Sequence, residues 1–155
     1  MGAPSDVTLG IESPRQADVE DLLAALDAYQ GALYPPESNH FLDVEALAAP
    51  DIRFFVARRS RQALGCGALR IDAAGYGELK RMFVRPEARG LRLGRRILDR
   101  IEEEARRERL GCLRLETGIH QAEALGLYRT AGYAERGAFG GYKPDPLSVF
   151  MEKSL

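Results

Sequence analysis

The sequence is poor in the residues that build disulfide frameworks and metal sites. It holds two cysteines and two histidines in 155 residues, and Cys66 and Cys112 lie far apart, with no CxxC or Cys/His spacing. This pattern excludes a structural zinc site and is typical of the reducing cytoplasm. Both cysteines lie in apolar, strand-like runs, so we interpret them as buried structural thiols, with a nucleophilic role as the alternative. We predict no metal.

Long apolar runs and targeting signals are also missing. No segment approaches the length of a transmembrane helix, and no signal peptide opens the chain. The opening Met-Gly-Ala-Pro-Ser-Asp resembles a myristoylation signal, but Asp6 stands where serine or threonine is required. There are no repeats or linkers, and 45% of the residues are hydrophobic. We therefore expect one domain over residues 1–155, in the cytoplasm and without membrane contact.

The net charge of −1 excludes a protein that binds nucleic acid nonspecifically through an overall positive charge, but the charges are segregated along the chain. Residues 1–51 carry ten acidic side chains and one basic one, whereas residues 80–109 carry eleven basic and six acidic. Such polarity suggests an anionic ligand at the basic pole and a cationic one at the acidic pole, although solvated helix faces give the same pattern. Few aromatic residues lie among the arginines for base stacking, so we predict no nucleic-acid partner.

Hydrophobic periodicity predicts a mixed α/β domain. Apolar residues at helical spacing predict helices over residues 14–33, 44–48, 93–109 and 121–131. Strands are predicted over residues 7–12, 53–58, 63–71, 78–84, 112–117 and 149–153. Ser13 is expected to cap the first helix, with Pro14 in its first position. Gly111 and Gly132 are expected to end the third and fourth helices.

The segments 78–84, 93–109 and 112–117 form a strand–helix–strand unit. A right-handed crossover of this kind makes the two strands parallel, and the connection after the first strand then lies where α/β folds bind ligands. That connection is rich in arginine and glycine, from Arg89 to Arg95. The head of the helix has backbone N–H groups without partners and a dipole that favours anions, and glycine lets a diphosphate approach. The sequence therefore predicts an anion cradle here.

Two common phosphate motifs do not fit this connection, because the chain has neither GxxxxGK[ST] nor GxGxxG at this place. Arg89-Gly-Leu-Arg-Leu-Gly94 instead resembles the pyrophosphate loop of the GNAT acetyltransferase superfamily, [RQ]xxGx[GA], with Arg92 in place of the internal glycine. Residues 78–84 resemble the fourth strand of that superfamily. Residues 121–133 resemble its closing segment, NxxAxxLYxxxGF, with Gln121 for the asparagine and Tyr133 for the phenylalanine.

The resemblance implies a small, single-domain, bacterial-type acetyltransferase. The implied fold is the GNAT acyl-CoA N-acyltransferase fold: a mostly antiparallel sheet with one parallel strand pair and about four helices. The implied reaction moves the acetyl group of acetyl-CoA to a primary amine of a small molecule or peptide, by direct attack in a ternary complex. A non-catalytic acyl-CoA-binding or sensor module is the alternative, and a homodimer is an additional expectation.

The fourth strand is expected to contain a bulge. Leu79, Met82 and Val84 cannot share one pleated face, so a bulge near residues 80–81 would absorb the odd step, unless the strand is buried on both faces. In the superfamily such a bulge parts the two parallel strands and frees backbone groups for the pantetheine arm. The resemblance thus implies these cofactor-binding residues: Met82, Phe83, Val84, Arg89, Gly90, Leu91, Arg92, Leu93, Gly94, Arg95, Gln121 and Tyr128.

The resemblance also implies catalytic groups. Tyr128 matches the tyrosine that protonates the departing CoA sulfur in many members, with packing on the core as the alternative. Glu78 matches the position of a catalytic glutamate, and partial burial would raise its pKa toward a useful range. Glu116, His40 and a water chain are alternative bases. The acceptor is expected to contact residues 34–40 and 139–146, where ordinary loop chemistry is the competing interpretation.

Overall fold

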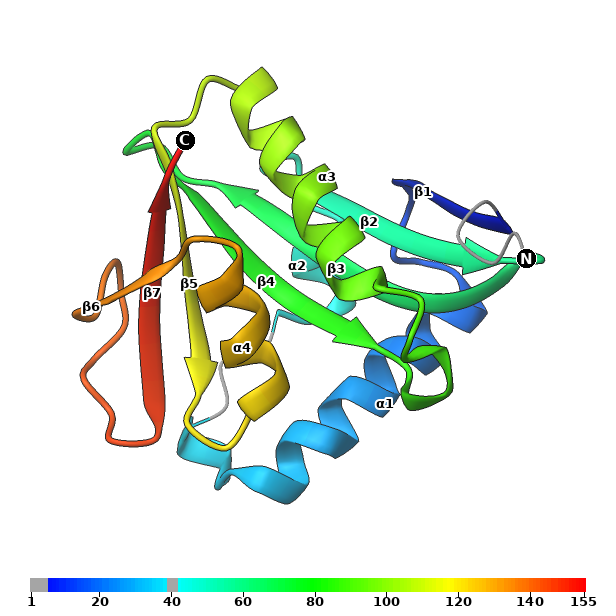
Figure 1. Ribbon diagram of the computed structural model, residues 1–155, viewed down its shortest axis with the longest axis horizontal. Helices are drawn as coiled ribbons and strands as arrows, with labels where there is room; N and C mark the ends of the chain where they lie inside the picture. Colours follow the sequence, from blue (N-terminus) through cyan, green and yellow to red (C-terminus); the bar gives the residue numbers. More distant parts are fainter. Residues whose placement is uncertain (1–5, 39–41) are drawn as a thin grey trace.

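The computed structural model describes residues 6–38 and 42–155. Its seven-stranded sheet has the order β1-β2-β3-β4-β5-β7-β6 (Figure 1). The predicted candidate base His40 lies outside the described residues. The strands are β1 (Val7–Ile11), β2 (Ile52–Arg59), β3 (Gln62–Ile71), β4 (Gly77–Val84), β5 (Cys112–Gly118), β6 (Ala134–Arg136) and β7 (Ser148–Ser154).

Four α-helices in the described part of the chain cover the two faces of this sheet. In Figure 1, α3 and α4 lie in front of the sheet and α2 lies behind it. One core cluster packs α3 and α4 against the sheet, and a second packs α1 and α2 against β2 and β3. The helices are α1 (Ala17–Leu33), α2 (Val44–Leu47), α3 (Leu93–Arg107) and α4 (Ala122–Thr130), with short 3₁₀ turns η2 (Pro36–Ser38) and η3 (Pro86–Ala88).

The predicted mixed sheet is confirmed. β4 and β5 pair in parallel, and the other neighbouring strands pair antiparallel. The parallel pairing is short: Gly77, Glu78 and Leu79 pair with Leu113, Arg114 and Leu115, and no pair follows. The strands therefore part beyond Leu79, on the side where the α3 connection begins.

The predicted bulge in β4 is also confirmed. Cys66 pairs with Phe83 and Ala68 with Lys80, so Arg81 and Met82 together stand opposite the single residue Gly67. Arg81 has a left-handed backbone, with φ 56°. A Cβ at Gly67 would collide with the Met82 side chain and with α3, so glycine leaves the room that the bulge requires.

Some element ends differ from prediction. The first helix begins at Ala17, not Pro14, because the Ser13 hydroxyl accepts the Arg15 N–H in a local turn, and Gln16 becomes the N-cap. α3 ends at Arg107, and the left-handed residue after it is Arg109, with φ 61°, rather than Gly111. Gly132 follows α4 with φ 100°, as expected for a helix stop. The short edge strand β6 was not predicted.

Candidate functional site

A groove of about 890 Å³ runs from the head of α3, past β4 and α4, to the turn that follows α1. It brings together residues from distant parts of the chain. Eleven of the twelve predicted cofactor residues line it: Met82, Phe83, Val84, Arg89, Gly90, Arg92, Leu93, Gly94, Arg95, Gln121 and Tyr128. Leu91 is the exception, because its side chain packs against the hydrophobic core. Their binding roles remain predictions.

The head of α3 forms one end of the groove. No side chain caps this helix, and its first intrahelical bond runs from the Arg96 N–H to the Arg92 carbonyl. The amides of Leu93, Gly94 and Arg95 therefore lack helical acceptors. Gly94 also lies close to α4, since an added Cβ would stand 3.3 Å from Leu127. This end offers amide donors and arginine charge to an anion.

Arg92 occupies the position where the family pattern has glycine. It is the N-cap of α3, with φ 58° and ψ 32°, in the left-handed region. A non-glycine residue costs roughly 1–2 kcal/mol there. Arg92 therefore supplies a left-handed residue at the head of α3 and adds a cation to the groove.

The middle of the groove lies along the parted strand. Phe83 and Val84 pair with Cys66 and Gly65 of β3, while on the opposite edge of β4 the pairing with β5 ends at Leu79. Backbone donors and acceptors on that edge are available to an extended ligand, as in a strand that pairs with a peptide.

Tyr128 lies in α4 with its ring buried and its residue lining the groove. Its hydroxyl makes no hydrogen bond to another residue within 6–38 and 42–155. Burial raises the pKa of this phenol, and the negative charge of Glu116 raises it further. Tyr128 therefore stays protonated at neutral pH and can donate a proton to a leaving group.

Gln121 holds the turn between β5 and α4. Its side-chain oxygen accepts the Gly118 N–H at 3.1 Å and lies 3.4 Å from the Thr117 hydroxyl. The amide oxygen is thus used within the protein, and the amide nitrogen is the group that a ligand in the groove would meet.

The structure does not bring Glu78 into this groove. Its side chain lines a second cavity of about 420 Å³, together with residues 139–145. The carboxylate is almost fully buried and lies 3.1 Å from Arg70 and 3.5 Å from Lys80. It also accepts a hydrogen bond from the hydroxyl of Tyr142. Two cations and a phenol thus contact the Glu78 carboxylate in a cavity separate from the groove, and its catalytic role stays a prediction.

Glu116, the second predicted base, does line the groove. Its carboxylate accepts the Ser148 hydroxyl at 2.7 Å. Burial is the main cause of the raised pKa of Tyr128, and the negative charge of the nearby Glu116 is the second cause. The structure therefore combines a carboxylate and a protonated tyrosine at one place.

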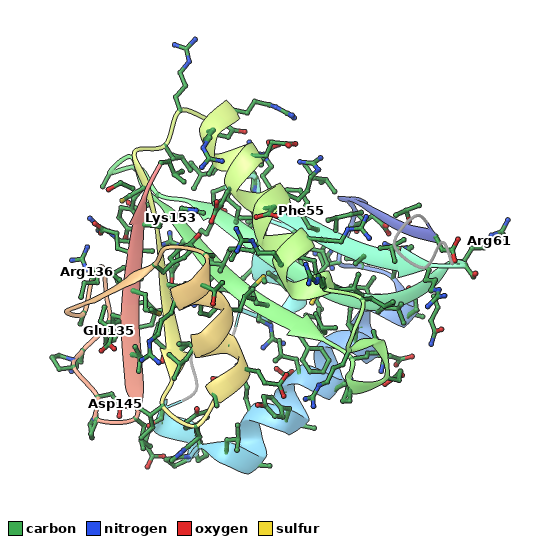
Figure 2. All side chains as sticks on the ribbon, viewed as in Figure 1. Phe55, Arg61, Glu135, Arg136, Asp145 and Lys153 are labelled. Carbon is green, nitrogen blue, oxygen red and sulfur yellow. The ribbon has the colours of Figure 1, made fainter. Side chains whose placement is uncertain are left out.

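The expected acceptor loops are divided between the two cavities. Tyr34 and Ser38 line the groove, whereas residues 139–145 and Glu37 line the second cavity. The two loops are joined by the Ser38 hydroxyl, which donates to Asp145 at 2.8 Å; Asp145 is labelled in the loop before β7 in Figure 2.

Tyr34 is fixed against the end of β5. Its hydroxyl accepts the His120 N–H at 3.1 Å, and its ring stacks on the His120 ring with centroids 5.6 Å apart. A Cβ at Gly118 would overlap the Tyr34 hydroxyl, so the glycine is needed for this contact.

Neither a metal cluster nor a membrane-spanning helix is found in the part of the chain that the structure describes. No three of its histidine, cysteine, aspartate or glutamate residues are grouped so that they could hold a metal ion. No helix there is long and apolar enough to cross a membrane.

Comparison with known proteins identifies the family. The model of the acetyltransferase (GNAT) family matches residues 19–133. The chain belongs to the GNAT acetyltransferase family. A relative from Azospirillum brasilense, named IAA acetyltransferase, is 60% identical over 97% of this chain and 99% of its own length.

Solved structures agree with this assignment. A Klebsiella pneumoniae protein, provisionally described as an acyl-CoA N-acyltransferase, has a TM-score of 0.81 and 40% identity, covering 96% of this chain and 97% of its own. An N-acetyltransferase from Thermoplasma acidophilum, solved with coenzyme A, has a TM-score of 0.72 at 18% identity over 96% and 99% of the two chains, and shows the shared fold.

Membership of this family makes the chain an acetyltransferase whose co-substrate is acetyl-CoA. The groove fits that co-substrate, because an uncapped helix head with two positive-φ residues lies at one end and an open strand edge lies beyond it. The GNAT acyl-CoA N-acyltransferase fold predicted from the sequence is confirmed, and the enzyme is favoured over the non-catalytic module.

Proposed function

We propose that this acetyltransferase moves the acetyl group of acetyl-CoA directly to a primary amine of a small molecule or peptide, in a ternary complex. The observation that carries the proposal is the single groove in which the anion-binding helix head, the open edge of β4, Tyr128 and Glu116 follow one another. When both substrates are held in one groove, the amine can be positioned against the thioester and attack it directly, so no acyl-enzyme is needed.

The state of the cysteines supports direct attack. Neither Cys66 nor Cys112 is among the described residues that line the groove. Cys66 is fully buried, and burial raises the pKa of its thiol to about 12, so little thiolate forms at neutral pH. A covalent cysteine intermediate is therefore not part of the proposal.

We assign three roles. Glu116 takes a proton from the ammonium form of the acceptor, and the neutral nitrogen then attacks the thioester carbonyl carbon. The backbone N–H of Met82 or Phe83 stabilises the oxyanion that forms. When the carbon–sulfur bond breaks, Tyr128 gives its proton to the departing thiolate, and the second proton that leaves the nitrogen restores the Tyr128 phenol. Glu116 replaces Glu78 as the preferred base because it lies in the groove, on the side where the strands have parted.

The acceptor end of the groove is lined by Tyr29, Tyr34, Ser38, Glu116 and Leu147. This mixture of aromatic, apolar and carboxylate groups suits an amine attached to an apolar or aromatic body. Because the Azospirillum brasilense relative is named IAA acetyltransferase, IAA belongs among the candidate acceptors beside primary amines. We also propose that the protein acts in the cytoplasm and without a nucleic-acid partner, which its free thiols and net charge of −1 support.

The test is thiol release from acetyl-CoA with a panel of amines, amino acids, peptides and IAA. With the best acceptor, double-reciprocal plots at several acetyl-CoA concentrations should intersect, as a ternary complex requires; parallel lines would instead reveal a covalent intermediate. Glu116→Gln should lower kcat by at least about 100-fold, whereas Glu78→Gln should retain most of it. The reverse order would return the base role to Glu78.

A further inference from the structure

Arg81 is a buried cation at the place where β4 leaves β5. It forms the bulge together with Met82, and its backbone is left-handed, with φ 56°. Its side chain is only 5% exposed, although the residue borders the groove. An arginine is a costly choice here, because a left-handed backbone favours glycine and a buried charge requires a partner.

That partner comes from the wall across the groove. A guanidinium nitrogen of Arg81 lies 2.6 Å from the Asp27 carboxylate of α1 and 3.5 Å from the Leu23 carbonyl. Two residues of the same helix, Tyr29 and Gln30, line the groove. The Arg81 side chain therefore connects the bulge to the helix that forms the opposite wall.

The bulge is held on its other side as well. The Arg81 carbonyl accepts the Cys66 thiol of β3 at 3.3 Å. Met82 and Phe83 follow immediately, and the Phe83 ring lies 6.5 Å from the Tyr29 ring. The orientation of their backbone amides thus depends on how Arg81 is fixed between β3 and α1.

We infer that the Arg81–Asp27 ion pair positions the bulge against α1 and so aims the amides of Met82 and Phe83 at the thioester oxygen. A glycine at position 81 could adopt the same backbone without strain, so the conformation alone does not call for arginine. The side chain adds a connection between the two groove walls. This inference rests on the oxyanion role proposed above, and it makes Arg81 and Asp27 positioning residues for acetyl transfer.

The chain offers a matched control on the same helix. Asp18 of α1 forms an ion pair with Arg58 of β2, also at 2.6 Å. The two aspartates are equally exposed, at 48% for the Asp18 side chain and 47% for Asp27. Neither Asp18 nor Arg58 borders the groove. The two pairs differ chiefly in whether the arginine belongs to the bulge.

The experiment compares kcat, the KM for acetyl-CoA and the melting temperature of Asp27→Ala, Asp27→Asn and Asp18→Ala. Asp27→Ala should lower kcat by at least about tenfold, because catalysis depends steeply on the placement of donors, and should change the acetyl-CoA KM by less than about threefold. Asp27→Asn, which keeps a polar oxygen beside Arg81 but loses the charge, should fall between Asp27→Ala and the native enzyme. Asp18→Ala should lower the melting temperature while kcat stays within about twofold. Equal kcat values for the two alanine variants would overturn the inference.

A double variant separates positioning from stability. Asp27→Ala/Arg81→Gly leaves no buried unpaired charge and suits the left-handed backbone, so its melting temperature should recover relative to Asp27→Ala. Its kcat should remain at least about tenfold below native, because the ion pair that fixes the bulge against α1 is then missing. Recovery of kcat together with stability would show that the pair only stabilises the fold. Failure of the proposed function is detected separately: if the native enzyme, with Asp27 in place, reacts through a covalent intermediate, its double-reciprocal plots will be parallel whatever these variants do.

Discussion

Arg89 and Glu123 meet across the mouth of the groove, where a guanidinium nitrogen of Arg89 lies 3.2 Å from the Glu123 carboxylate. Arg89 precedes α3, and Glu123 lies in the first turn of α4. Both residues line the groove at the end that offers amides to an anion. A bound diphosphate must therefore compete with Glu123 for Arg89.

Glu123→Gln should tighten acetyl-CoA binding, because it removes both the competing carboxylate and its repulsion of phosphate. An exposed ion pair contributes at most about 1 kcal/mol, so the dissociation constant should fall by about two- to fivefold. Calorimetric titration with CoA measures this change. Glu135→Gln is the control, since Glu135 forms a comparable exposed pair with Arg129 at 3.1 Å but lies in β6, away from the groove (Figure 2). A weaker affinity in Glu123→Gln would mean that Glu123 supports the ligand.

Arg92→Gly should have opposite effects on stability and binding. Glycine relieves the left-handed strain, so the free energy of unfolding should rise by about 1 kcal/mol. The lost cation should weaken CoA binding by about three- to tenfold and make it less dependent on salt. Urea unfolding and titration at two salt concentrations measure both effects.

Arg109→Gly is the control for that variant. Arg109 also has a left-handed backbone, with φ 61°, but it lies after α3 and does not line the groove. It should gain similar stability and leave CoA affinity unchanged. If Arg92→Gly binds CoA as tightly as the native protein, the arginine makes no useful contact with the phosphates.

Tyr128→Phe should lower kcat by about 100-fold while the affinity for CoA changes little, because the hydroxyl acts only as the thiolate departs. Burial raises the pKa of Tyr128, so its protonated form persists as pH rises. The native kcat should therefore show no alkaline loss from this group up to the ordinary tyrosine pKa of about 10. A matched loss of kcat and affinity would assign Tyr128 to binding instead.

Tyr133→Phe is the structural comparison for Tyr128→Phe. The Tyr133 hydroxyl donates to the buried Glu102 at 2.9 Å, and the two tyrosine rings are 5.9 Å apart. Removing that donor from a buried carboxylate should cost about 1–3 kcal/mol of stability and leave kcat within about threefold.

Local sequence signals predicted the features of the site that depend on neighbouring residues. The odd spacing of Leu79 and Met82 predicted the bulge, because side-chain alternation acts within one strand. The basic, glycine-containing run before α3 predicted a helix head with arginines around it, because these features are also set by residues close in the sequence. Anion binding there stays a prediction. Arg92, which stands where the family pattern has glycine, adopts a left-handed backbone.

Distant pairings decided what the sequence left open. Leu79 and Leu115 form the last pair between β4 and β5, so Glu78 precedes the point of parting and Glu116 follows it. Glu78 pairs with Arg114, which is two residues before Glu116, so both glutamates lie on the same face of the sheet. Only this register, which the sequence does not reveal, shows that Glu116 is the one that reaches the groove. The contacts of Glu78 with Tyr142 and of Arg81 with Asp27 likewise join residues more than fifty positions apart. No local pattern predicts such contacts.

The acid sensitivity of the fold should depend on Arg58. Its guanidinium bonds the Glu12 carboxylate at 2.9 Å and Asp18 at 2.6 Å, and these hydrogen bonds lower the pKa of both carboxyl groups below their ordinary values of 4.5 and 3.8. The unfolded chain therefore binds protons at a higher pH than the native protein does. The stability from these groups is complete above the ordinary values and is lost as pH falls through the lowered ones.

The comparison is between urea unfolding of the native protein and of Arg58→Ala, from about pH 7 down to about pH 3. Both will lose stability in acid, since the pKa values of Asp72 and Glu152 are also lowered. The native protein should lose more, because it alone has the Arg58 contribution to lose, so the gap between the two curves should narrow below about pH 4.5. Arg15→Ala removes an exposed arginine that pairs with Glu45 at 2.8 Å, and its curve should run parallel to the native one. A gap for Arg58→Ala that stays constant with pH would mean that Arg58 stabilises the fold through packing of its side chain rather than through charge.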